Sequence, residues 1–151
     1  MMQLKDTKET KTLSIRLTTS VSELPKIIGE AYEEIMAYMQ HEGVQCSGYP
    51  YVLYHNMDMN NLDVDIGWPV QHDANGEGRI KPSTIPGGKV LFATHKGPYS
   101  TLENTYKEVM AYIEKNGIKT TEWMYEMYPN SPQDTPPEEL ITEIYFPVKS
   151  E

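Results

Sequence analysis

The first half of the chain alternates apolar and polar residues and then repeats apolar residues at a helical spacing. Leu13, Ile15 and Leu17 alternate with polar neighbours, which predicts a half-buried strand. The apolar positions that follow recur at intervals of three and four residues, namely Leu24, Ile28, Ala31, Ile35 and Met39. This stripe predicts an amphipathic helix, with Ser22 capping its start and Gly43 following its end.

The second half shows the same succession of patterns. Residues 89–94 predict a strand, and the stripe of the next helix consists of Leu102, Tyr106, Val109 and Ile113. Ser100 and Glu103 form a capping-box pattern at its start, and Gly117 follows its end. Two antiparallel strand pairs complete the predicted elements: 49–56 with 62–68, and 122–128 with 140–146. The connector 73–86 predicts one further short strand around 79–81.

The two halves are also similar residue by residue. Residues 32–44 match residues 106–118 without a gap, at an offset of 74. Residues 64–70 match residues 142–148 at an offset of 78, because the second half has a longer loop. The sequence therefore predicts two copies of one unit, at about 11–70 and 88–148.

These patterns predict an α+β fold in a single domain, residues 1–151. A duplicated β-α-β-β unit would form an antiparallel sheet with two helices. Neither copy buries a one-sided sheet alone, so we expect the copies to dock with pseudo-twofold symmetry. Such docking would leave a central cleft, and ligand sites favour such seams.

Strand alternation indicates which side chains would face that cleft. Ile144 and Phe146 share one face of the last strand, and Glu143 and Tyr145 share the other. Because the apolar face must pack on the helices, Glu143 and its repeat equivalent Asp65 would look into the seam. A carboxylate there is costly unless it is paired, hydrogen-bonded or neutralised. The alternative is that both carboxylates face water on an open sheet surface.

Composition and charge exclude some classes of function. Acidic residues outnumber basic ones by 22 to 13, and the net charge of −9 argues against direct binding of nucleic acid. No apolar run approaches the ~18 residues of a membrane span, residues 1–10 are unlike a signal peptide, and Cys46 is the one cysteine. We therefore expect a cytoplasmic protein. The 11 tyrosines, against 2 Trp and 2 Phe, suggest a lined cavity or a wet interface.

Three segments resemble a known family: residues 86–99 (PGGKVLFATHKGPY), 54–58 (YHNMD) and 134–148 (DTPPEELITEIYFPV). They are similar to the GyrI-like small-molecule-binding domain, which is also the effector-binding domain of AraC- and MerR-type multidrug regulators. The resemblance implies a SOUL/GyrI-like fold, duplicated around a cleft. It also implies that a glutamate on the last strand meets lipophilic cations among aromatic rings, and Glu143 occupies that position.

The resemblance leaves several roles open. Only residues 1–10 precede the first predicted strand, so we expect a stand-alone form without a DNA-binding domain. Some stand-alone relatives are gyrase-inhibitory proteins, and others are hydrolases that open cyclopropanoid toxins. The motifs do not separate binding from turnover.

The first hypothesis is a small-molecule-binding module for lipophilic, cationic or aromatic ligands. Its candidate ligand-binding residues are Glu143, Tyr145, Trp68, Asp65, Tyr54 and Tyr128. The second is a hydrolase of strained electrophiles, in which Glu143 would activate water and Tyr145 would donate a proton. The third is a protein partner of gyrase or of a separate regulator, bound through the acidic surface.

No metal or cofactor is expected. The four histidines, His41, His55, His72 and His95, lack the spacing of a metal site, and none suits an axial haem position. His95 lies in the turn 95–99 (HKGPY), where we expect it to orient the loop.

Overall fold

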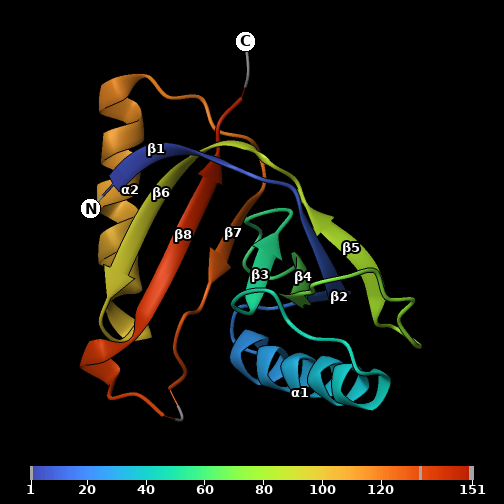
Figure 1. The fold of residues 1–151 in the computed structure, drawn as a ribbon. Coiled ribbons are helices and arrows are strands. Elements are labelled where there is room, and N and C mark those ends of the chain that lie inside the picture. The colour runs from blue at the N-terminus through green and yellow to red at the C-terminus, as the bar shows by residue number, and fades with distance from the viewer. Residues whose placement is uncertain (1, 133, 150–151) are drawn as a thin grey trace. The chain divides into compact units, whose positions relative to one another are not determined.

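The computed structural model describes residues 2–132 and 134–149. Residues 1, 133, 150 and 151, which the predicted domain includes, lie outside the described residues. The chain divides into two compact units, residues 8–87 and residues 1–7 with 88–151. Each unit combines antiparallel strands with one α-helix, so the predicted α+β class is confirmed (Figure 1).

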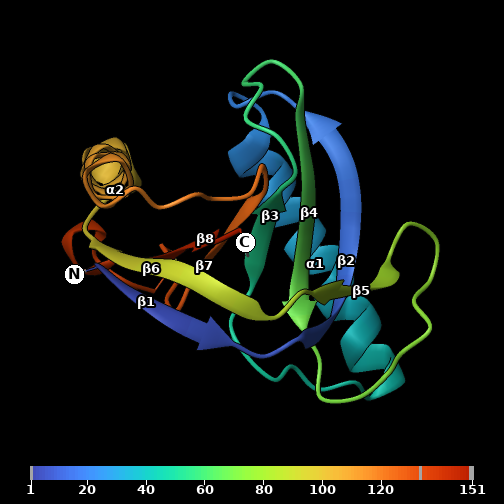
Figure 2. The ribbon, with the colours of Figure 1, turned by 90° about the horizontal axis from the view of Figure 1, so that it is seen from above.

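The first of these units, residues 8–87, contains four strands and helix α1. Its elements are β2 (Thr10–Thr19), α1 (Leu24–Glu42), β3 (Tyr51–Tyr54), β4 (Leu62–Pro69) and β5 (Lys81–Ile85). All its strand pairs are antiparallel, in the order β3-β4-β2-β5. Helix α1 lies along one face of these strands (Figure 2). Their apolar face and the helix stripe form the core, in which Ile15, Ile35 and Ile66 are fully buried.

The other unit, residues 1–7 and 88–151, also contains four strands and one α-helix. Its elements are β1 (Met2–Thr7), β6 (Gly88–Lys96), the 3-10 helix η1 (Tyr99–Thr101), α2 (Leu102–Asn116), β7 (Met124–Met127), the 3-10 helix η2 (Pro137–Glu139) and β8 (Ile141–Pro147). The strands are antiparallel in the order β1-β6-β8-β7. Val109 of α2 and Ile144 of β8 are fully buried.

Both units follow the predicted order of strand, helix, strand, strand: β2-α1-β3-β4 and β6-α2-β7-β8. The glycine ends of both helices are confirmed, since Gly43 and Gly117 adopt positive φ angles of 71° and 61°. The superposition of the two halves, their pseudo-twofold relation and the cleft stay predictions.

Several local predictions were wrong. Neither helix start has a side-chain cap: Glu23 and Thr101 hold the cap positions, and the Ser22 hydroxyl contacts the Ser20 hydroxyl instead. Residues 2–7, expected to precede the first strand, form β1 through a full ladder with β6. That ladder compensates for the lack of buried side chains in β1, which leaves little pattern to detect. The connector strand lies at Lys81–Ile85 rather than around 79–81.

Gly67 in β4 provides a test of this packing. A Cβ atom at Gly67 would lie 2.3 Å from the Leu13 carbonyl oxygen on β2, whereas a Cβ atom at Gly29 of α1 meets nothing within 4 Å. We expect Gly67→Ala to lower the free energy of unfolding by about 1–3 kcal/mol. Gly29→Ala should raise it by about 0.5–1 kcal/mol because alanine favours the helix. Urea denaturation measures both, and a Gly67→Ala variant as stable as the wild type would contradict the register.

Candidate functional site

Glu126, in the short strand β7, is a carboxylate inside the core of its unit. It lies opposite Ile144 of β8, so its side chain shares the face that packs on α2. Only 5% of Glu126 is exposed. A charged group at such a position costs free energy unless hydrogen bonds or a counter-ion compensate it.

Two tyrosine hydroxyls hold this carboxylate. Tyr106 of α2 donates to Oε2, and Tyr128, just beyond β7, donates to Oε1 at 2.6 Å. Among the described residues, no ion pair joins Glu126 to a lysine, arginine or histidine. Burial raises the pKa of Glu126 above the ordinary 4.5, and the two tyrosine hydrogen bonds and the nearby His95 oppose that rise. The carboxyl is therefore held by neutral donors and tends to retain its proton.

Aromatic rings surround the hydrogen-bonded trio. Tyr99 of η1 packs edge-on against Tyr128, with ring centroids 6.3 Å apart, and Phe146 packs edge-on against Tyr106 at 6.0 Å. Burial raises the pKa of Tyr99, and an ionised Glu126 adds to that rise. Tyr99 is 41% exposed and connects the cluster with solvent. We call Glu126, Tyr99, Tyr106, Tyr128 and Phe146 the Glu126 cluster.

His95 fixes the turn that carries Tyr99. It is buried, with Nδ1 2.6 Å from the Thr105 hydroxyl and Nε2 3.1 Å from the Pro98 carbonyl oxygen. These contacts tie the end of β6 to the first turn of α2. A positioning role for His95 agrees with the expectation from the sequence.

Glu143 of β8, the carboxylate singled out by the sequence, lies on the opposite face of the same strands. The Tyr145 hydroxyl donates to Glu143 Oε1 at 2.9 Å. The Tyr145 ring stacks on Tyr125 of β7 at 4.6 Å and 8°, and contacts Phe92 of β6 at 5.0 Å. Lys5 of β1 also reaches these rings. We call Lys5, Phe92, Tyr125, Glu143 and Tyr145 the Glu143 face.

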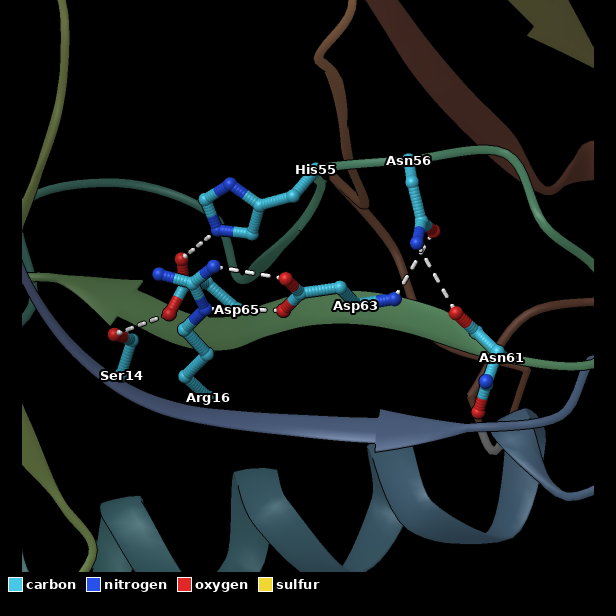
Figure 3. Close-up of polar contacts among 7 residues, drawn as sticks. All are labelled: Ser14, Arg16, His55, Asn56, Asn61, Asp63 and Asp65. Carbon is cyan, nitrogen blue, oxygen red and sulfur yellow. Dashed lines mark hydrogen bonds and ion pairs between the residues drawn. The ribbon is translucent and has the colours of Figure 1, made fainter.

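In the unit of residues 8–87, Asp65 on β4 has its own partners (Figure 3). Its carboxylate lies 2.6 Å from His55 Nε2 and 3.4 Å from the Ser14 hydroxyl. Arg16 donates two hydrogen bonds to the neighbouring Asp63, which lowers the pKa of Asp63. Asp65 is thus hydrogen-bonded, and these bonds offset the cost of partly burying a carboxylate.

Trp68 and Tyr54 lie on the other face of that unit's strands, toward α1. Trp68 contacts Tyr32 of α1 with ring centroids 5.7 Å apart. Tyr54 lies opposite the fully buried Val64. Of the six predicted site residues, the structure therefore joins Glu143 directly to Tyr145. Tyr128 belongs to the Glu126 cluster, and Tyr54 and Trp68 do not share the face of Asp65.

Glu126 is not among the site residues predicted from the sequence, although the sequence holds a signal for it. At the offset of 74, Glu126 aligns with Val52, and the flanking tyrosines Tyr106 and Tyr128 align with Tyr32 and Tyr54. Val52 is fully buried. A carboxylate aligned with a core valine is therefore not needed for packing, and this contrast marks Glu126 as a functional candidate.

Within residues 2–132 and 134–149, no group of three or more His, Cys, Asp or Glu side chains is arranged to hold a metal ion. Neither helix in this part of the chain combines the length and the apolarity needed to cross a membrane.

Comparison with known proteins gives one family and a set of similar structures. A model of the GyrI-like small molecule binding domain matches residues 1–149. The crystal structure of the EcmrR C-terminal domain is 28% identical, with a TM-score of 0.83 over 100% of this chain and 98% of that one. The EcmrR–DNA complex gives a TM-score of 0.86 at 28% identity, and the chain spans 58% of the EcmrR chain in it. A search of curated proteins finds no match.

Two more distant structures share the fold. SAV2435 bound to tetraphenylphosphonium is 19% identical, with a TM-score of 0.74 over 99% of this chain and 94% of that one. A hydrolase from Listeria innocua is 17% identical, with a TM-score of 0.68 over 98% of this chain and 91% of that one. At these identities the likeness concerns the fold alone.

The raised pKa of Glu126 predicts a distinct pH dependence of stability. Because the folded state binds this proton more tightly than the unfolded state, the wild type should lose stability as pH rises from about 4.5 toward the pKa of folded Glu126. Glu126→Gln removes this loss. The free energy of unfolding of Glu126→Gln minus that of the wild type should therefore increase as pH rises, by at most about 1.4 kcal/mol per pH unit.

Urea denaturation between pH 4 and pH 8 measures this difference. Glu108→Gln, an exposed position on α2, is the matched control and should run parallel to the wild type. A constant offset between Glu126→Gln and the wild type across this range would show that the Glu126 pKa is not raised.

Proposed function

Because the chain belongs to the GyrI-like small-molecule-binding family, we propose that it binds hydrophobic organic cations with Glu126 as their anionic anchor. The observation that carries the proposal is a buried carboxylate that forms no ion pair within residues 2–132 and 134–149, is held by tyrosine hydroxyls and lies among aromatic rings. The family relation extends to the effector-binding domain of EcmrR.

An ionised Glu126 has no ion-pair partner among the described residues. The two hydroxyls offer hydrogen bonds but no positive charge, so the ionised form stays costly in this core. A ligand cation beside the carboxylate supplies the missing charge and favours loss of the Glu126 proton. The faces of the surrounding tyrosine rings attract the same cation by roughly 0.5–2 kcal/mol each, depending on desolvation. A neutral ligand of the same shape gains only the apolar contacts.

The most suitable ligand is large, apolar and singly charged. Tetraphenylphosphonium has this chemistry, and SAV2435, which shares the fold, is seen bound to it. Such a cation is weakly hydrated, so its transfer into an aromatic site costs less than that of a compact ammonium ion. Tyr99, the exposed ring of the cluster, would contact the ligand first.

The other predicted site residues keep narrower roles in this proposal. Tyr128 orients the Glu126 carboxylate, while Glu143 and Tyr145 form a second carboxylate–tyrosine pair on the opposite face of the strands. Asp65, Tyr54 and Trp68 stay predictions as ligand contacts. Multidrug binding, a cytoplasmic location and a regulator or gyrase as a protein partner also stay proposals.

Isothermal titration with tetraphenylphosphonium tests the anchor. We expect Glu126→Gln to weaken binding roughly 10- to 100-fold, since an ionic hydrogen-bond partner is lost. Wild-type affinity should rise with pH while Glu126 is still protonated in the free protein, because the bound state requires the ionised carboxyl. Glu108→Gln, the control variant, should bind like the wild type.

Triphenylphosphine oxide is the neutral comparison ligand. It should bind more weakly than the cation, and Glu126→Gln should not affect its binding. Equal losses for both ligands would mean that the substitution disturbs the packing of the Glu126 cluster rather than removing the anchor. Unchanged cation binding in Glu126→Gln would refute the proposal.

Hydrolysis is the second candidate function, and one observation favours it. A carboxyl with a raised pKa beside tyrosine hydroxyls suits general-base catalysis near neutral pH. Water would add across a strained carbon–carbon bond, so that one carbon gains the hydroxyl and the other gains the proton. Glu143 and Tyr145 offer the same pair of groups.

Mass spectrometry of cyclopropane- and ester-bearing electrophiles incubated with the protein tests this candidate. Turnover would appear as a gain of about 18 Da, the mass of water, when a cyclopropane ring opens, and as separate acid and alcohol products when an ester is cleaved. It should disappear in the Glu126→Gln or the Glu143→Gln variant, whichever removes the base, while Glu108→Gln retains it. Compounds that stay unchanged but raise the melting temperature would favour the binding function.

A further inference from the structure

The loop that joins β3 to β4, residues 55–61, carries three side chains that suit a soft metal ion. In its sequence, HNMDMNN, His55, Met57 and Met59 alternate with Asn and Asp residues. Met57 is 52% exposed and Met59 is 48% exposed, so the core does not require either side chain. Thioether sulfur is a soft ligand that binds Cu(I), and imidazole also suits copper.

His55 is oriented in the way that is typical of a metal-binding histidine. Its Nε2 atom lies 2.6 Å from Asp65 Oδ2, and Asp65 Oδ1 accepts a hydrogen bond from the Ser14 hydroxyl. Because an ionised carboxylate only accepts, Nε2 carries the proton of the neutral ring and Nδ1 carries the lone pair. Nδ1 points away from Asp65 (Figure 3). A histidine that binds a metal through one ring nitrogen commonly donates the other N–H to a carboxylate.

Hydrogen bonds from the other side chains of the loop hold its backbone in place. The Asn56 side chain donates to the Asn61 carbonyl oxygen and accepts from the Asp63 N–H, each at 3.1 Å (Figure 3). The Asp58 carboxylate accepts from the Asn60 N–H, also at 3.1 Å. The loop is therefore closed by its Asn and Asp residues, and the two thioethers are left to the solvent side.

The ligand set of this loop selects a particular class of metal. Zn²⁺ sites use Cys, His, Asp and Glu, and no such group occurs in the part of the chain that the structure describes. Two thioethers and a neutral imidazole bring no negative charge, which suits a soft monovalent ion. Met57 and Met59 lie two and four residues after His55, and the flexible methionine side chain allows both sulfurs to turn toward Nδ1.

We propose that this loop binds Cu(I) through His55 Nδ1 and the sulfur atoms of Met57 and Met59. Asp65 is a positioning residue, because it fixes the imidazole ring and makes Nδ1 a stronger donor to the metal. The His55 side chain is 31% exposed, so the ion reaches the ring from solvent. The site lies within the unit of residues 8–87 and does not depend on the proposed function of Glu126.

Nuclear magnetic resonance of the methionine methyl groups tests the site, with Ag(I) in chloride-free buffer as a soft monovalent probe. Cys46 is exposed and its thiol would compete for the ion, so the protein carries Cys46→Ser. The Met57 and Met59 resonances should shift together and stop changing at one Ag(I) per chain. Met110, which is 46% exposed on α2, should not shift. Equal shifts of all three, or no shift of Met57 and Met59, would overturn the proposal.

Competition with the Cu(I) chelator bicinchoninate, under anaerobic reducing conditions, measures the affinity for copper. In the Cys46→Ser background, we expect Asp65→Asn to weaken Cu(I) binding roughly 10-fold, since the carboxylate no longer supports the ring. His55→Gln, Met57→Leu and Met59→Leu each remove a ligand and should weaken binding at least as much.

Met110→Leu and His41→Gln are the matched controls, because they change an exposed methionine and an exposed histidine outside the loop. Both should bind Cu(I) like the Cys46→Ser parent. Because Met57 and Met59 are exposed, their leucine variants should keep the melting temperature of the parent. Unchanged affinity in these leucine variants, an equal loss in Met110→Leu, or displacement of Ag(I) by equimolar Zn²⁺ would each refute a soft-metal site.

Discussion

The burial of Glu126, which has no ion-pair partner in the part of the chain that the structure describes, is the constraint on which the proposed site depends. Glu126 is 5% exposed and faces α2, and its hydrogen bonds come from the neutral hydroxyls of Tyr106 and Tyr128. Desolvation favours the protonated form, and any cation that enters favours the ionised form. In the proposed site, proton loss from Glu126 and the charge of the ligand would therefore be coupled.

The unit of residues 8–87 has the same order of elements but no carboxylate at the position equivalent to Glu126. At the aligned positions, Val52 replaces the carboxylate, and the Tyr32 hydroxyl donates to the Tyr51 backbone carbonyl instead. Tyr32 packs on Trp68 much as Tyr106 packs on Phe146. A valine core thus supports the same order of strand, helix, strand, strand. The buried carboxylate costs free energy of folding, and we propose that ligand binding is what it serves.

Much of the fold was predictable, because hydrophobic periodicity and glycine helix ends are local signals. Strand β1 was missed because it is held by a backbone ladder, which a side-chain pattern does not record. Strand alternation paired Glu143 with Tyr145 on one face. Glu126 was not predicted because β7 is only four residues long, and in so short a strand a carboxylate reads as a residue that faces solvent. Its burial depends on Tyr106, 20 residues away, which only the tertiary structure brings close.

The most direct test of this account is the carboxyl carbon resonance of Glu126, followed against pH with and without tetraphenylphosphonium. We expect the Glu126 pKa to lie above 4.5 in the free protein and to fall when the cation binds. A carboxyl that titrates at its ordinary value, or a pKa that the bound cation leaves unchanged, would contradict the coupling between burial and ligand charge.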